Sequence, residues 1–286
     1  MKIVDIVGGL GNQMFQYALA IVLEKRTGEP VYVDVSTFET YKVHNGLELE
    51  RVFGLKLNKA TWWQITRLAY YSRNYKLNRL MRKILPRRKT MCFEFPLEKF
   101  DERKLYSPDS MYYEGYWQHA RYFDEYAEDV RRTFTFAGEL LGRSADLRNV
   151  IELSNSVSIH IRRGDYLQEK NYCGLCDVNY YKKAVEHICK HVANPHFFIF
   201  SNDVEWCKEH IVPMLEDYDI VDCHSGQDSY KDMWLMSLCK HMILANSSFS
   251  WWAAYLNKNK GIVIAPKLWT RNTKTYNRQL SEWILM

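Results

Sequence analysis

The sequence has no apolar run near the roughly 18 residues that a membrane-spanning helix needs. Its N-terminus enters an apolar segment at Ile3 without the charged and then apolar regions of a secretion signal, so we expect no such signal. The seven cysteines are an odd number for a chain of this size, which favours reduced thiols over a disulfide framework. These absences predict a globular protein of the cytoplasm.

Acidic residues are missing from one long stretch. Between Arg51 and Phe93 the sequence has twelve Lys or Arg and no Asp or Glu. Apolar residues at helical spacing predict a helix over residues 62–89 with basic side chains between them. Two interpretations stay open for this segment: a solvated helix face, or peripheral contact with an anionic inner membrane. No zinc-finger, RRM or helix-turn-helix pattern supports nucleic-acid binding, so we expect none.

The chain of 286 residues is long enough for two domains, and its aromatic share of 15% suits a protein that stacks on sugars or bases. A polar connection over residues 138–144 and a short helix to residue 153 precede a change of pattern. We therefore predict an N-terminal α/β domain over residues 1–153 and a C-terminal domain over 154–286, with a tail at 267–286 that can pack back on the first domain.

The N-terminal part begins as a strand–helix–strand unit. A buried strand at 2–7 leads to a glycine-rich loop and a helix at 14–26, which Gly28 closes before a strand at 31–35. Backbone N–H groups at the start of such a helix attract anions. The dinucleotide-binding pattern fails where Met14 replaces a small residue, but Asp34 resembles its ribose-binding acid. An NAD-dependent reductase is therefore retained as an alternative.

From residue 156 onward, strands and helices alternate regularly. The expected strands are 157–162, 196–200, 219–223, 241–245 and 261–265, and the expected helices are 179–193, 204–215, 228–239 and 248–257. This alternation predicts a parallel, Rossmann-like sheet. Polar residues follow three of the strands, at 160–163, 201–203 and 246–249. Because ligands of such sheets bind at the carboxyl ends of the strands, these residues predict a nucleotide-diphosphate crevice.

The segment Val157–Tyr166 is the strongest candidate within that crevice. His160, Arg162 and Arg163 come together where the strand breaks at Gly164. Guanidinium groups stay charged at any working pH and present paired donors that match phosphate oxygens. We therefore predict an anion site here.

Two patterns resemble metal sites. Cys173 and Cys176 precede His187 and His191 at zinc-like spacing, but the histidines lie on an ordinary sheet-packing helix. The pair Asp217 and Asp219 lies at the amino edge of the predicted sheet, away from the crevice. We expect that the protein requires no metal.

Four motifs resemble those of the α-1,2-fucosyltransferases, chiefly the bacterial branch. They occur in the family's order and span residues 8 to 256. The motifs are GGLGNQMFQYA at 8–18, HIRRGDY at 160–166, FSND at 200–203 and NSSFSWWAAYL at 246–256.

The resemblance implies a two-domain, B-type glycosyltransferase-like fold and an inverting, metal-independent transfer of L-fucose from GDP-β-L-fucose to the 2-hydroxyl of a terminal β-galactose. By motif, Arg162 would bind the β-phosphate, with His160 beside it and Asn12 reaching across the cleft. Asp232 would bind guanine, with Asp228 as an alternative. The remaining donor-binding residues by resemblance are Gly9, Gly11, Arg163, Asn202, Ser247, Ser248 and Phe249.

The residue that would deprotonate the acceptor stays open between Asp165, Glu169 and neither. Other interpretations also stay open: another GDP-sugar or linkage on the same fold, and a lectin-like or nucleic-acid-binding module that uses the basic segment.

Overall fold

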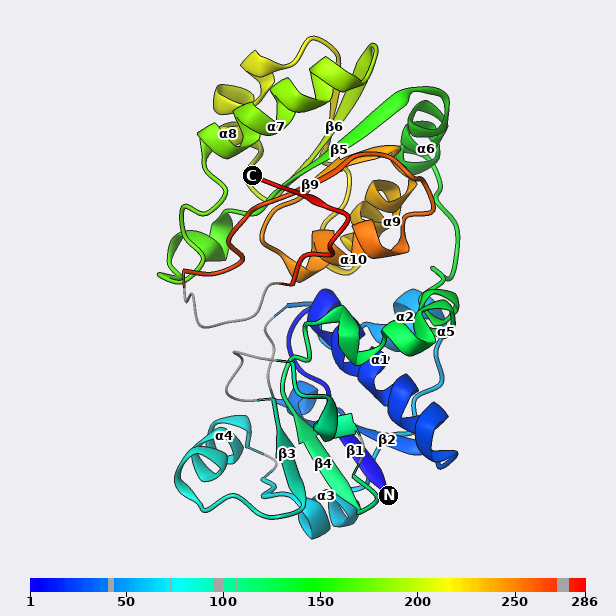
Figure 1. Ribbon diagram of the computed structural model, residues 1–286, viewed down its shortest axis with the longest axis vertical. Helices are drawn as coiled ribbons and strands as arrows, with labels where there is room; N and C mark the ends of the chain where they lie inside the picture. The colour runs from blue at the N-terminus through cyan, green and yellow to red at the C-terminus, as the bar shows by residue number, and fades with distance from the viewer. Residues whose placement is uncertain (41–43, 73, 95–99, 106, 272–277) are drawn as a thin grey trace. The chain divides into compact units, whose positions relative to one another are not determined.

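The computed structural model describes residues 1–40, 44–72, 74–94, 100–105, 107–271 and 278–286, and it divides the chain into two compact units (Figure 1). The first unit is Met1–Ala137, and the second begins at Gly138 and includes the described C-terminal residues 278–286. The boundary predicted at 153/154 therefore moves to 137/138, because helix α6 (Arg143–Leu153) belongs to the second unit. The described end of the tail also belongs there, since β10 (Ile284–Leu285) pairs with β9 (Val263–Ala265).

The first unit contains a four-stranded parallel sheet in the order β2-β1-β4-β3. Helix α1 packs on β1 and β2. Helix α3 packs on the sheet through a core that includes Ile3, Ile65 and Tyr112. The strands are β1 (Lys2–Asp5), β2 (Val31–Asp34), β3 (Met91–Phe93) and β4 (Met111–Glu114), and the helices are α1 (Leu10–Thr27), α2 (Leu49–Phe53), α3 (Trp62–Leu68), α4 (Tyr75–Ile84) and α5 (Ala127–Thr133).

The predicted end of α1 is confirmed. Gly28 has a φ of 67°, and its N–H donates to the carbonyl of Glu24 at 2.8 Å, so the helix ends in a left-handed glycine cap. The helix starts earlier than expected, at Leu10. The glycine loop therefore meets the N-terminus of α1 directly.

The single helix predicted over residues 62–89 is wrong, because the segment forms α3 and α4 with a break between them. The side chain of Thr61 caps the start of α3. The Oδ1 atom of Asn74 accepts from the N–H of Leu77 at 3.2 Å and so begins a separate helix. Strand β3 follows where the sequence predicted no strand.

The second unit contains a six-stranded parallel sheet in the order β10-β9-β8-β5-β6-β7, which confirms the predicted Rossmann-like alternation. Its other strands are β5 (Asn155–Ile161), β6 (Pro195–Ser201), β7 (Tyr218–Val221) and β8 (His241–Ile243), and its other helices are α7 (Val178–His191), α8 (Val204–His210), α9 (Tyr230–Leu238) and α10 (Ser248–Leu256).

The alternation of side chains along β5 divides the second unit into layers. Val157, Ile159 and Ile161 enter a core that α7 and α8 complete. His160 faces the other way, toward α10, where its ring lies near Phe249. Figure 1 shows the helices of this unit covering its sheet. Both faces of β5 are therefore buried, as expected of a central parallel strand.

The order of the strands reverses direction at β5. From β5 the chain proceeds to β6 and β7 on one side, and then crosses to β8, β9 and β10 on the other. The gap between the carboxyl ends of β5 and β8 is therefore the topological switch point, where open α/β sheets bind ligands.

Within the described residues, no helix combines the length and the apolar composition needed to cross a bilayer.

Candidate active site

The carboxyl end of β5 places His160 against the start of α10. The rings of His160 and Phe249 lie 5.7 Å apart between centroids, and the hydroxyl of Tyr181 donates to the His160 carbonyl at 3.0 Å. The His160 side chain is buried, and its Nδ1 atom has no hydrogen-bond partner within the described part of the chain. Burial, together with the nearby charge of Arg162, lowers the pKa of His160 to about 3. The imidazole is therefore neutral at physiological pH.

Arg162 follows β5 directly, on the side of the switch point. Its guanidinium lies 5.6 Å from the ring centroid of Tyr166, and the side chain is half-buried. The hydroxyl of Tyr166 donates to the carbonyl of Asn246 at 3.4 Å. Tyr166 thus connects the arginine loop after β5 to the loop after β8, and the Arg162 guanidinium lies beside its ring.

Arg163 points toward α8. Its Nε donates to Oδ2 of Asp203 at 3.0 Å, and its guanidinium lies 4.1 Å from the ring centroid of Trp206. Its backbone N–H donates to Oδ1 of Asn202 at 3.0 Å. These contacts show that Arg163 and Asn202 support the loop, and the donor contacts expected of them stay a prediction.

The turn at Gly164 depends on the absence of a side chain. Its φ is 20°, and a Cβ atom there would come within 2.3 Å of the Asn202 Nδ2 atom. Asn202 therefore packs against the glycine while it holds the N–H of Arg163. The loop bends where it does because this close approach is open only to glycine.

The start of α10 follows β8, on the other side of the switch point. Ser247 is the N-cap, and its hydroxyl accepts from the N–H of Phe249 at 3.3 Å. The first N–H groups of a helix lack partners within the helix and attract anions. Asn246 is buried, and it donates to the Trp269 carbonyl at 3.2 Å. Ser247, Ser248 and Phe249 thus lie at the switch point as predicted, on a loop that Asn246 anchors.

Asp232 is part of a hydrogen-bonded chain that sequence analysis missed. Nδ1 of His224 lies 2.6 Å from Oδ1 of Asp232, and Oγ of Ser144 lies 2.6 Å from Nε2 of His224. Burial raises the pKa of Asp232, and the hydrogen bond from His224 partly offsets this. The alternative acid, Asp228, is exposed and pairs with Lys231 at 2.9 Å. Of these two acids, Asp232 is the one whose carboxylate a partly buried hydrogen bond holds in place.

The glycine loop belongs to the first unit. Gly9 is the N-cap of α1, Gly11 lies in the first turn, and Oδ1 of Asn12 accepts from Nε2 of Gln118 at 2.6 Å. The motif's glutamines explain why the loop is ordered. Gln13 donates to the carbonyls of Gly8 and Gly46 at 2.9 and 2.8 Å, and Gln16 accepts from the N–H of Val7 at 2.9 Å.

Asp34 does not support the reductase alternative. Its Oδ1 accepts from the N–H and hydroxyl of Ser36 at 3.0 and 2.6 Å, and its Oδ2 accepts from the hydroxyl of Tyr112 at 2.8 Å. The side chain is buried, so both oxygens have internal partners and neither is presented to a ribose.

The two candidate bases differ in what the structure says of them. Glu169 is exposed, and its backbone shapes the turn after the arginine loop. The side chain of Asp165 lies outside the described residues.

Of the residues resembling metal ligands, Cys176 donates from Sγ to Oδ1 of Asn246 at 3.4 Å. Asp217 and Asp219 contact His196 at 2.9 and 3.0 Å, at the amino end of β7.

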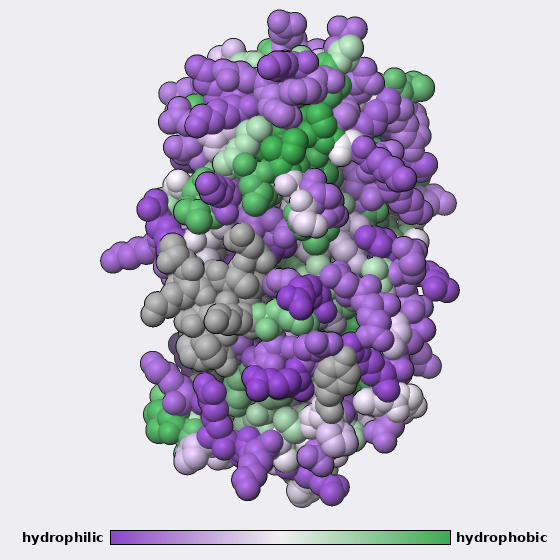
Figure 2. All heavy atoms as spheres, in the orientation of Figure 1, coloured by the Kyte–Doolittle hydropathy of each residue, from purple (hydrophilic) through white to green (hydrophobic). Residues whose placement is uncertain are grey.

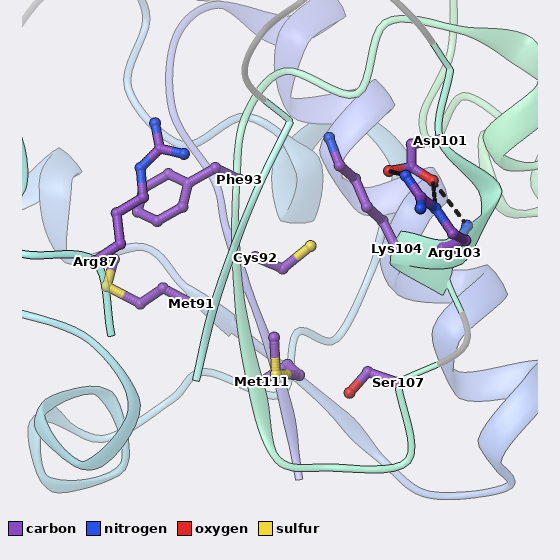
Figure 3. Close-up of a pocket in the computed structure, with 9 residues that line it drawn as sticks. All are labelled: Arg87, Met91, Cys92, Phe93, Asp101, Arg103, Lys104, Ser107 and Met111. Atoms are coloured by element: carbon purple, nitrogen blue, oxygen red, sulfur yellow. Dashed lines mark hydrogen bonds and ion pairs between the residues drawn. The ribbon is translucent and has the colours of Figure 1, made fainter. Parts of the chain in front are cut away.

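A separate hollow of about 470 Å³ lies along β3 in the first unit and contains none of the predicted site residues (Figure 3). Its cationic side chains have internal contacts. Arg103 pairs with Asp101 at 2.9 Å, Lys104 donates to the Glu94 carbonyl at 3.1 Å, and Arg87 lies over the ring of Phe93. The residues around the switch point of the second unit therefore stay the candidate site, on the grounds of their chemistry.

The fold is that of the B-type glycosyltransferase-like enzymes, with two α/β units, of which the C-terminal one is Rossmann-like. A fucosyltransferase from Bradyrhizobium, NodZ, has a similar structure, with a TM-score of 0.52 at 14% identity over 88% of this chain and 92% of that one. At this identity the likeness establishes the fold alone.

The sequence establishes the family. The chain belongs to glycosyl transferase family 11, whose model matches residues 1–286. It is 35% identical to an alpha-1,2-colitosyltransferase of Escherichia coli over 92% of this chain and 90% of that protein. An O-antigen biosynthesis glycosyltransferase of E. coli, WbnK, is 28% identical over 97% of each chain. A galactoside alpha-(1,2)-fucosyltransferase 2 of Gorilla gorilla gorilla is 23% identical over 93% of this chain and 71% of that protein.

Proposed function

We propose that this glycosyltransferase is an inverting α-1,2-fucosyltransferase that moves L-fucose from GDP-β-L-fucose to the 2-hydroxyl of a terminal β-galactose. The carrying observation is the arrangement at the switch point, where Arg162 and His160 after β5 lie beside the start of α10 after β8. The α-1,2 linkage in the names of two relatives supports the proposed linkage.

Arg162 and the α10 N-terminus suit the leaving diphosphate. As the sugar–phosphate bond breaks, negative charge grows on the diphosphate while the sugar becomes oxocarbenium-like. Hydrogen-bond donors that are already in position bind the diphosphate more tightly in the transition state than in the intact donor sugar. This difference lowers the barrier. The connection through Tyr166 and the cap at Ser247 hold these donors in place before substrate arrives. We further propose that this positive charge replaces a metal ion in the reaction.

Asp232 suits the base of the nucleotide. A carboxylate accepts from both the N1–H and the 2-amino group of guanine, a pair of donors that adenine lacks. The bond from His224 fixes Oδ1 of Asp232 and directs the carboxylate. The glycine-loop residues Gly9, Gly11 and Asn12 belong to the other unit, and their donor contacts remain part of the sequence-based prediction.

Transfer of colitose is a second candidate, favoured by the relative at 35% identity. Colitose is L-fucose without its 3-hydroxyl, so the two donors differ by one hydrogen-bonding group. An apolar contact at this position discriminates weakly, whereas a polar group placed to bond a hydroxyl rejects the analogue that lacks it. Comparing the two donors therefore tests the sugar independently of the nucleotide site.

The deciding experiment is turnover with lactose in the presence of EDTA, using GDP-fucose and GDP-colitose in parallel. Wild type is compared with Arg162→Ala and with Arg148→Ala, an exposed arginine on α6 that pairs with Glu152. We expect an α-1,2-fucosylated product, a loss of roughly 10²–10³ in rate for Arg162→Ala, and no change for Arg148→Ala.

The outcomes separate the parts of the proposal. A colitosylated product alone would establish the second candidate. GDP release without transfer would keep the donor and reject lactose as acceptor. Activity only after a divalent metal is restored would contradict metal independence. No turnover of either donor by folded protein would contradict the donor assignment.

A further inference from the structure

Helix α4 buries polar residues and exposes apolar ones. Asn78 and Arg82 face the sheet and are buried, whereas the exposed fractions of Leu77, Leu80 and Ile84 are 48%, 50% and 68%. Positions 77, 80 and 84 recur at helical spacing, so they form one stripe along the helix. An ordinary surface helix would turn this stripe inward.

The orientation of α4 is fixed by Arg82. Its Nη1 donates to Oδ2 of Asp5 at 3.0 Å and lies 3.5 Å from Oε2 of Glu114, and its Nη2 donates to the hydroxyl of Tyr112 at 2.7 Å. Asp34 lies 3.8 Å from the same guanidinium. Rotating the helix to bury its leucines would leave these carboxylates in the interior without a cation, at a cost greater than the apolar gain.

The exposed side of α4 is strongly basic. Lys76 and Lys83 are exposed beside the stripe on the same helix. The described acids that contact α4, Asp5, Asp34 and Glu114, all lie beneath it around Arg82. Figure 2 shows hydrophobic atoms at the lower left, where α4 lies in Figure 1. The apolar stripe is therefore flanked on its own helix by positively charged lysines.

Helix α3 of the same unit also exposes large apolar side chains. Trp62 and Trp63 stack with their ring centroids 3.7 Å apart and are 45% and 68% exposed. Nη1 of Arg88, which follows α4, donates to the carbonyls of Thr66 and Ala69 at 2.7 and 3.2 Å and so joins the two helices. Tryptophan rings are favoured at the level of lipid headgroups. The two helices joined by Arg88 thus expose aromatic, aliphatic and cationic groups.

We propose that this surface of α3 and α4 binds the face of a bilayer that contains anionic lipids. The leucine stripe enters the boundary between headgroups and acyl chains, and the flanking lysines contact lipid phosphates. The inference does not depend on the identity of the donor or of the linkage. It gives a physical reason for the exposed Lys76 and Lys83 in the stretch between Arg51 and Phe93 that has no acidic residue.

The test is co-sedimentation of the full chain with vesicles of phosphatidylcholine alone or of equal parts phosphatidylcholine and phosphatidylglycerol. One variant combines Leu80→Gln with Ile84→Gln, and another combines Lys76→Gln with Lys83→Gln. Two matched controls lie in the second unit: Leu153→Gln, at an exposed leucine on α6, and the pair Lys258→Gln and Lys260→Gln. Melting curves verify that each variant is folded.

Wild type should bind the anionic vesicles and bind neutral ones far more weakly. Because each basic residue near an anionic surface is worth about fivefold in partition, the double lysine variant should bind about thirtyfold more weakly. The double apolar variant should also lose binding, and both controls should match wild type.

Two results would overturn the proposal. One is a vesicle-binding result: wild type fails to bind anionic vesicles, or the control variants lose as much binding as the α4 variants. The other is a solution dimer that the α4 variants dissociate while vesicle binding stays unchanged, which would make this face an interface between two copies of the chain. Sedimentation velocity on the same variants measures that second result.

Discussion

The guanidinium of Arg163 lies over the indole of Trp206, 4.1 Å from the ring centroid. This contact draws the second arginine of the HIRRGDY motif away from its neighbour and onto α8. Adjacent arginines in the sequence thus serve different purposes in the structure. Arg162 lies at the switch point, while Arg163 stabilises the loop through its contacts with Trp206 and Asp203.

We predict that Arg163→Met keeps donor affinity nearly unchanged but lowers the transfer rate by about tenfold to a hundredfold, since small displacements of a catalytic group are costly. The variant should also lose about 1–2 kcal/mol of unfolding free energy, from the ion pair and the contact with the ring. Titration calorimetry with GDP, steady-state kinetics and denaturant unfolding measure the three quantities. A loss of GDP affinity equal to that of Arg162→Ala would instead make Arg163 a phosphate ligand.

We predict that His160 makes the protein sensitive to acid. Its pKa is about 3 in the folded chain against an ordinary 6.5, so between these values the unfolded chain binds a proton that the folded chain excludes. Stability therefore rises with pH across that window and falls as pH drops through it. The stability difference between wild type and His160→Gln should shrink from pH 7 toward pH 4, as followed by thermal melts.

An exposed histidine provides the control for this experiment. His191 lies at the end of α7, and its Nδ1 atom donates to the His187 carbonyl at 2.8 Å. The stability difference between wild type and His191→Gln, measured over the same range, shows how much an exposed histidine contributes. If the His160→Gln difference does not change with pH, the imidazole is not held neutral by burial.

We predict that Asp232→Asn weakens GDP binding by about tenfold to a hundredfold, the typical effect of a hydrogen bond to a charged group. Wild type should bind GDP more tightly than IDP, which lacks the 2-amino donor, and the variant should lose most of this preference. Calorimetry with both nucleotides provides the measurement. Asp228→Asn is the matched control, and a loss of preference in that variant would transfer the guanine contact to Asp228.

The sheet of the second unit could be predicted from the sequence because its signals are local. The strands β5 to β9 are short and rich in apolar residues, helical segments separate them, and parallel pairing then brings their carboxyl ends to one edge. The positions of His160, Arg162 and Ser247 follow from that rule alone. The short β3 and β10 give too little pattern to be recognised.

Contacts between distant parts of the chain could not be predicted. Ser144 and His224 lie 80 residues apart in sequence, and nothing in either segment indicates that they meet. The different orientations of Arg162 and Arg163 depend on the ring of Trp206, which lies on α8. The orientation of α4 depends on acids on the three strands β1, β2 and β4, which outweigh the apolar pattern on which the sequence prediction relied.

The position of β5 in its sheet also constrains the order in which the active site forms. β5 pairs on one side with β6, the next strand, and on the other with β8, where Val157 pairs with His241. Closing the second pairing requires a much longer loop, which raises its entropic cost and slows its formation. During synthesis, β5 to β7 can therefore assemble as a half-sheet before the proposed site at the switch point between β5 and β8 has formed. Catalytic competence is thus a late event in folding, and a chain released before α10 is made would fold in part without an active site.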